Sequence, residues 1–145
     1  MPFNITLFNT ETHRDAVISL WQTVFGYEAS HNEPNLVIDK KLEMDDELFF
    51  VALDRDTVIG TAMAGYDGHR GWIYSIAVAP EYRHQGVGSR LLLFAEDKLS
   101  SLGCMKINLQ ILEGNASVQN FYLSNGYSTE ERISMGKQVP KNIPS

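Results

Sequence analysis

The sequence predicts one α/β domain, of the mixed α+β type, in which helices cover the faces of a mixed sheet. Its 145 residues fit a single domain, and 43% of them are hydrophobic, which is enough to build a core. Strand-like and helix-like hydrophobic patterns follow one another in the order β-α-α-β-β-β-α-β-α-β. We expect the domain to span residues 1–139 and a short C-terminal tail to occupy residues 140–145.

The first half of the chain predicts a strand, two helices and three further strands. Residues 3–7 alternate between apolar and polar, which indicates a half-buried strand. Thr12 and Asp15 resemble a capping box, and apolar residues at helical spacing continue from there to Gly26. The Asp67-Gly68 pair is typical of a hairpin turn. The remaining elements expected here are a short helix at 35–44 and strands at 48–53, 58–66 and 72–78.

The second half predicts a strand–helix–strand unit. A long helix is expected before Gly103, because apolar residues recur along one face of it, namely Val87, Leu91, Ala95 and Leu99. Residues 106–112 alternate as a strand, which a right-handed crossover would place parallel to the strand at 72–78. A helix at 116–124 and one or two strands within 127–139 complete the predicted order.

Charge and cysteine content disfavour several classes of protein. The net charge of −6 is unlike that of proteins that coat nucleic acid, which neutralise phosphates with Lys and Arg. Cys104 is the only cysteine, so we expect no internal disulfide and a cytoplasmic location. The sequence shows no signal peptide and no apolar run near the ~18 residues of a membrane span. The acidic run 45–47 is interpreted as a solvated turn, and no metal site is expected.

A glycine-containing loop between the strand at 72–78 and the long helix carries the strongest chemical signal. Gly86 and Gly88 let the backbone approach a ligand, and the first-turn amides of a helix attract phosphate groups. Arg83 adds a formal positive charge. The loop does not match the Walker A motif, and it matches the dinucleotide-binding fingerprint poorly. The alternative that remains open is that the two glycines only ease a tight turn.

Two segments resemble the GNAT N-acetyltransferase superfamily. Residues 76–92 are similar to its acetyl-CoA-binding motif, Gln/Arg-x-x-Gly-x-Gly/Ala, and residues 115–127 are similar to its second signature. The predicted element order is also that of the superfamily, so the resemblance covers nearly the whole chain. Residues 65–72 further resemble a small bacterial branch of YpeA-like acetyltransferases, although His31 stands where that branch has Trp.

The resemblance implies how acetyl-CoA would be held. The fourth and fifth strands would splay apart, and the backbone of the fourth strand would bind the pantetheine arm. The amides of the loop and of the helix start would bind the pyrophosphate. The residues implied in cofactor binding are Ile76, Val78, Arg83, Gln85, Gly86, Val87, Gly88, Ser89, Asn115 and Tyr122.

The chemistry implied is direct transfer of the acetyl group to a primary amine. Tyr122 is the candidate for the acid that protonates the leaving thiolate, and the alternative is a core aromatic. Glu113 is the candidate general base, with Glu81 and His69 as alternatives. The amide of Val78 would stabilise the developing oxyanion. Asn115 could cap the following helix, bind the cofactor, or do both.

The expected function is an N-acetyltransferase that acts on an amine of a small molecule, peptide or protein. The acceptor site would lie between the 26–34 loop, the second helix, the 67–72 hairpin and the last strands. Acidic residues there could attract a cationic amine, namely Glu28, Glu33, Asp67 and Glu113. The alternatives are an acyl-CoA sensor without turnover and a phosphate-binding domain of another fold. The resemblance also allows a homodimer.

Overall fold

The computed structural model describes residues 2–26 and 33–140. The chain forms two compact units, Met1–Gln110 and Ile111–Ser145, and each is described by itself. Glu28 and His31, the latter at the position where the YpeA-like branch has Trp, lie outside the described residues, as does most of the expected tail. The prediction of one domain over residues 1–139 stays a prediction.

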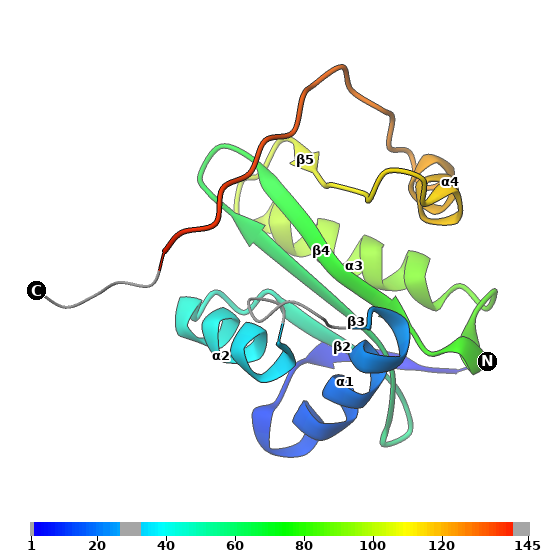
Figure 1. Cartoon of the computed structure of the whole chain (residues 1–145). Coiled ribbons are helices and arrows are strands. Elements are labelled where there is room, and N and C mark those ends of the chain that lie inside the picture. Colours follow the sequence, from blue (N-terminus) through cyan, green and yellow to red (C-terminus); the bar gives the residue numbers. More distant parts are fainter. Residues whose placement is uncertain (1, 27–32, 141–145) are drawn as a thin grey trace, which may run out of the picture. The chain divides into compact units, whose positions relative to one another are not determined.

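The first unit is built on a five-stranded mixed sheet whose strands lie in sequence order (Figure 1). The strands are β1 (Asn4–Leu7), β2 (Phe49–Asp54), β3 (Thr57–Tyr66), β4 (Gly71–Val78) and β5 (Ile107–Asn108). Neighbours from β1 to β4 are antiparallel, and β4 and β5 are parallel. This confirms the mixed sheet and the parallel pair predicted on either side of the long helix.

Helices cover both faces of this sheet, as Figure 1 shows. The helices of the first unit are α1 (Thr10–Val24), α2 (Pro34–Met44), the 3₁₀ helix η2 (Pro80–Tyr82) and α3 (Val87–Ser101). Helix α3 packs on β2, β3 and β4, while α1 packs on β3, β4 and α2. The second unit contains α4 (Ala116–Ser124), whose bounds match the sequence prediction.

Two apolar layers hold the helices to the sheet. Helices α1 and α2 meet the sheet in a cluster that includes Trp21 and Ile38, both fully buried. The predicted apolar face of α3 is confirmed, since Leu91, Ala95 and Leu99 are all fully buried. Gly60 lets α3 approach β3 closely, because a Cβ there would lie 2.9 Å from a Leu91 methyl carbon. The burial of these faces fixes β4 and the start of α3, which carry the predicted cofactor residues.

The predicted helix start near Thr12 was wrong by one turn. The N-cap is Asn9, whose side-chain oxygen accepts hydrogen bonds from the amides of Glu11 and Thr12. Thr12 therefore lies inside α1. Both residue types cap helices, but only Asn9 precedes the first helical amides at the required distance.

The prediction of one or two strands after α4 was also wrong. The described residues between 127 and 139 contain no strand, although one or two strands were predicted there. Ile133 and Met135 are each 90% exposed, and Val139 is 89% exposed. A strand needs a paired neighbour and a buried face, and these residues have no buried face. The fifth strand is shorter than predicted as well, because only Ile107 and Asn108 pair with β4.

Candidate functional site

The start of α3 presents free backbone amides to solvent. Gly86 is its N-cap and has φ +83°, a left-handed conformation that glycine adopts without strain. Among the residues that the structure describes, no side chain caps this helix, whereas side chains cap α1, α2 and α4. The preceding residues Arg83 to Gly86 are exposed. The amides at the start of α3 are therefore open to solvent, and their binding of an anionic ligand stays a prediction.

The edge of β4 that faces β5 is largely unpaired among the described residues. The two strands pair only through Gly71 with Ile107 and Trp72 with Asn108. Toward the carboxyl end of β4, the Ala79 amide donates to the Ile59 carbonyl at 2.8 Å. Amide directions alternate along a strand, so the Val78 amide points away from β3 and toward the unpaired edge. The predicted separation of these two strands is thus present in the first unit.

This geometry fits the thiol carrier that the sequence predicts. A pantetheine arm offers amides that can pair with an unpaired strand edge, and a pyrophosphate suits an uncapped helix start. The predicted residues of both parts lie in one continuous segment, from Ile76 on β4 to Ser89 on α3. They could hold acetyl-CoA through backbone groups without a cluster of charged side chains.

A bulge in β4 is a feature that the sequence did not reveal. Met63 pairs with Tyr74, but Thr61 pairs with Ala77, so Ala62 lies opposite two residues. Ser75, one of these two, has φ +55°. Such a position usually carries glycine, and serine gives no sequence signal for it.

Tyr122 is a buried phenol in the second unit. It is 8% exposed, and its ring contacts those of Phe121 and Tyr127 at 5.0 and 5.5 Å between centroids. Burial raises the pKa of Tyr122 to about 12. Because this pKa lies far above neutral pH, the phenol keeps its proton, which a general acid requires. The ring packing also supports the core-aromatic interpretation, and the two roles are compatible.

Alkaline pH should destabilise the protein through Tyr122. An unfolded tyrosine loses its proton near pH ~10, while the folded residue keeps it to about pH 12. The stability that Tyr122 contributes is therefore complete below pH ~10 and lost as the pH rises toward 12, by at most about 2–3 kcal/mol. Urea unfolding of wild type and Tyr122→Phe, at about pH 8 and about pH 11, measures this. Equal losses in both proteins would refute the assignment.

Asn115 is the N-cap of α4, which supports its capping interpretation. Its side-chain oxygen accepts a hydrogen bond from the Val118 amide at 3.4 Å. The Ser117 hydroxyl lies at the same distance from that oxygen. A cofactor contact by Asn115 stays a prediction.

The three candidate bases are all exposed. Glu113 precedes the α4 cap, Glu81 lies in η2, and His69 lies in the β3–β4 hairpin. Asp67 has a structural role in that hairpin, since Oδ1 accepts from the amides of His69 and Arg70 at 2.8 and 2.7 Å. These hydrogen bonds lower the pKa of Asp67, so its carboxylate binds a proton more weakly than an ordinary aspartate does.

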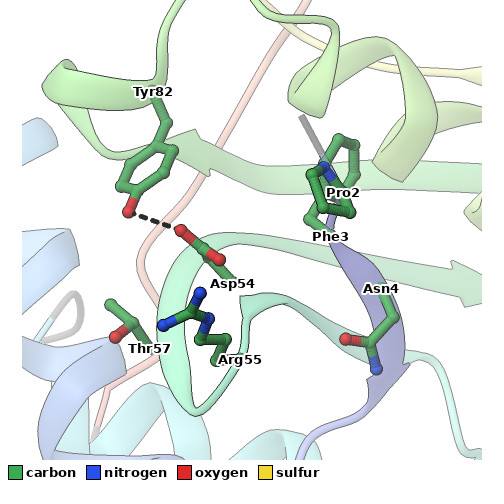
Figure 2. Close-up of a pocket in the computed structure, with 7 residues that line it drawn as sticks. All are labelled: Pro2, Phe3, Asn4, Asp54, Arg55, Thr57 and Tyr82. Atoms are coloured by element: carbon green, nitrogen blue, oxygen red, sulfur yellow. Dashed lines mark hydrogen bonds between the residues drawn. The ribbon is translucent and has the colours of Figure 1, made fainter.

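A separate pocket of about 780 Å³ lies beside the β2–β3 turn (Figure 2). Its lining residues are Pro2, Phe3, Asn4, Asp54, Arg55, Thr57 and Tyr82. The Tyr82 hydroxyl donates to Asp54 at 2.9 Å, and this hydrogen bond raises the pKa of Tyr82. The bond links η2, immediately before Arg83, to the β2–β3 turn. Sequence analysis missed this contact because the two residues lie 28 positions apart and neither forms a local motif.

Two further observations concern metals and membranes. Across residues 2–26 and 33–140, no three His, Cys, Asp or Glu side chains gather so that they could hold a metal ion. Every helix in the described part of the chain is too short or too polar to cross a bilayer.

Comparison with known proteins agrees with this geometry. The sequence profile described as "Acetyltransferase (GNAT) family" matches residues 14–127. An acetyltransferase of Yersinia pestis (strain Pestoides F) is 41% identical over 108 residues, which cover 74% of this chain and 77% of that protein. An acetyltransferase of Pectobacterium atrosepticum is 38% identical over 125 residues, which cover 86% of this chain and 88% of that one.

A solved structure shares the fold at lower identity. It is that of AAC(6′)-Iy in complex with the bisubstrate analogue CoA-S-monomethyl-acetylneamine. The TM-score is 0.76 at 18% identity, and the alignment covers 97% of this chain and 100% of the other. This likeness confirms the mixed-sheet fold that the sequence predicts.

Proposed function

Because the chain belongs to the acetyltransferase (GNAT) family and is an acetyl-CoA-dependent N-acetyltransferase, we propose which of its residues hold and transform the two substrates. The observation that carries the proposal is the uncapped start of α3 beside the unpaired edge of β4. The amides from Gln85 to Ser89 bind the pyrophosphate, with Arg83 adding charge. The backbone of Ile76 and Val78 binds the pantetheine arm.

Acetyl-CoA supplies an acetyl group activated as a thioester. The Val78 amide, which points to the unpaired edge, donates a hydrogen bond to the thioester oxygen as negative charge develops there. Tyr122 holds a proton on Oη and gives it to the leaving sulfur. Glu113 accepts the proton that the attacking ammonium group must lose, because an amine attacks only in its neutral form. Asn115 hydrogen-bonds to the cofactor in addition to capping α4.

The acceptor is a primary amine, and we propose a cationic one. The chain carries a net charge of −6, which favours the approach of a cation. Glu33 and Asp67 flank the expected acceptor region, although both also bind backbone amides. The solved structure that shares the fold is of an aminoglycoside N-acetyltransferase with a bisubstrate analogue, which supports an aminosugar or a small polyamine as the first acceptor to test.

A panel of acceptors tests this function. Release of free thiol from acetyl-CoA is followed with polyamines, aminoglycosides, aminosugars, lysine-containing peptides and peptide N-termini. We expect thiol release and an acetylated product with at least one cationic amine, saturable in both substrates. Tight binding of acetyl-CoA with no release for any amine would contradict transfer and favour the sensor alternative. Release with neutral amines alone would contradict the charge argument.

We also propose that the protein is a cytoplasmic homodimer and that it belongs to the YpeA-like branch of the family. The lone Cys104 suits a reducing compartment, and the apolar Ile133, Met135 and Val139 are exposed and available for a second copy. Sedimentation at micromolar concentration should give the mass of two chains. A monomer at every concentration would refute the dimer without affecting the assigned chemistry.

A further inference from the structure

We propose that Thr61 is a positioning residue for the cofactor strand. Its hydroxyl group fixes the peptide between Ser75 and Ile76 and thereby sets the direction of the Ile76 amide. The inference rests on the proposed function, in which that segment of β4 binds the pantetheine arm. It assigns a role to a buried polar contact that neither the motif nor the proposed chemistry uses.

The β4 bulge places a strained residue next to the cofactor segment. Ser75 has φ +55°, although it carries a side chain that disfavours this conformation. The conformation persists only when surrounding contacts hold it. Because Ala62 faces both Ser75 and Ile76, the regular β3–β4 ladder does not supply that restraint.

Thr61 supplies the missing restraint from the α1 side of the sheet. Its Oγ1 donates to the Ser75 carbonyl at 2.9 Å and accepts from Trp21 Nε1 at 2.9 Å. Thr61 and Trp21 are both fully buried, so water does not compete for either bond. The indole hydrogen occupies a lone pair of the hydroxyl oxygen, which leaves the hydroxyl hydrogen to point at the Ser75 carbonyl.

A planar peptide transmits this restraint to the cofactor side. In a trans peptide the carbonyl and the following N–H point in opposite directions. The Ser75 carbonyl points to Thr61, so the Ile76 amide points away from Thr61. Fixing the carbonyl therefore fixes the amide, and a peptide free to rotate would present that donor in several directions. Thr61 acts on acetyl-CoA only through this peptide.

Thr61→Val tests the proposal, because valine matches threonine in shape and lacks the hydroxyl group. We expect the KM and Kd for acetyl-CoA to rise about fivefold to tenfold, because the variant loses about one hydrogen bond that restrains the peptide. The value of kcat should stay within about twofold, since no reacting group is touched. Thr61→Ser keeps the hydroxyl and should restore wild-type KM. With acetyl-CoA bound, amide exchange at Ile76 should be faster in Thr61→Val than in wild type, and as slow in Thr61→Ser as in wild type.

Controls separate positioning from a loss of stability. Ile59→Val, on the same strand and fully buried, should lower the Tm and leave the KM for acetyl-CoA unchanged. If Thr61→Val does not fold, Trp21→Phe removes the indole donor along with part of a buried ring, and it should raise the KM in the same direction by a smaller factor. Unchanged KM and Ile76 exchange in a folded Thr61→Val protein would overturn the proposal. If wild type itself does not bind acetyl-CoA, the proposed function fails instead.

Discussion

Replacing Tyr122 by Phe is expected to lower kcat about 100-fold while the Kd for acetyl-CoA changes by less than about twofold. The substitution removes the phenol hydroxyl group alone, and the ring still packs against Phe121 and Tyr127. Because the raised pKa keeps this proton in place across neutral pH, its loss should affect turnover at every neutral pH value. Steady-state kinetics with the best acceptor amine, together with calorimetric binding of acetyl-CoA, measure both quantities.

Tyr127→Phe is the matched control for this variant. Its ring contacts Tyr122, but its hydroxyl group has no part in the proposed chemistry, so kcat should remain near the wild-type value. Turnover of Tyr122→Phe equal to that of wild type would remove Tyr122 from the mechanism. An equal loss in Tyr127→Phe would show that packing of the aromatic cluster, rather than the phenol proton, controls the rate.

The second large effect is expected from Gly86→Val. Gly86 has φ +83°, and a β-branched residue avoids this region at a cost of about 1–3 kcal/mol. Nothing lies within 4 Å of a Cβ built there, so backbone strain, not a clash, would drive the loop into another conformation. The amides at the start of α3 would then diverge, and the Kd for acetyl-CoA should rise about 10- to 100-fold.

Gly103→Val provides the comparison, since Gly103 has φ +93° and equally open surroundings just after the other end of α3. Both variants should lose similar stability in urea unfolding. Only Gly86→Val should lose affinity for acetyl-CoA in calorimetry. Equal affinities in the two variants would mean that the pyrophosphate does not bind at the start of α3.

Local patterns predicted much of this fold because they report burial directly. The apolar face of α3 and the bounds of α4 follow from hydrophobic spacing and helix stop signals, and the parallel β4–β5 pair follows from the right-handed crossover rule. The strands predicted within 127–139 are absent from the described residues, since a strand forms only where a neighbour pairs with it. The α1 cap was misplaced because Asn9 and Thr12 are both residue types that cap helices.

The backbone groups of the candidate site were predictable from the sequence, but the contacts that hold them in place were not. Gly86 and the helix after it carry a recognisable motif, and the structure leaves that helix uncapped. The bulge at Ser75 has no sequence signal, because serine seldom adopts a positive φ. The contacts of Thr61 with Trp21 and of Tyr82 with Asp54 join residues 40 and 28 positions apart. Only tertiary packing brings such pairs together, so spacing along the chain does not predict them.

The most direct test of acetyl-CoA binding at β4 and α3 is residue-resolved amide protection. Amide hydrogen exchange of the wild-type protein is measured with and without saturating acetyl-CoA. We predict slower exchange on binding at Ile76, at Val78 and from Gln85 to Ser89, with smaller changes in α1 and β1. Saturable binding that leaves these amides unchanged and protects another part of the chain would contradict the account.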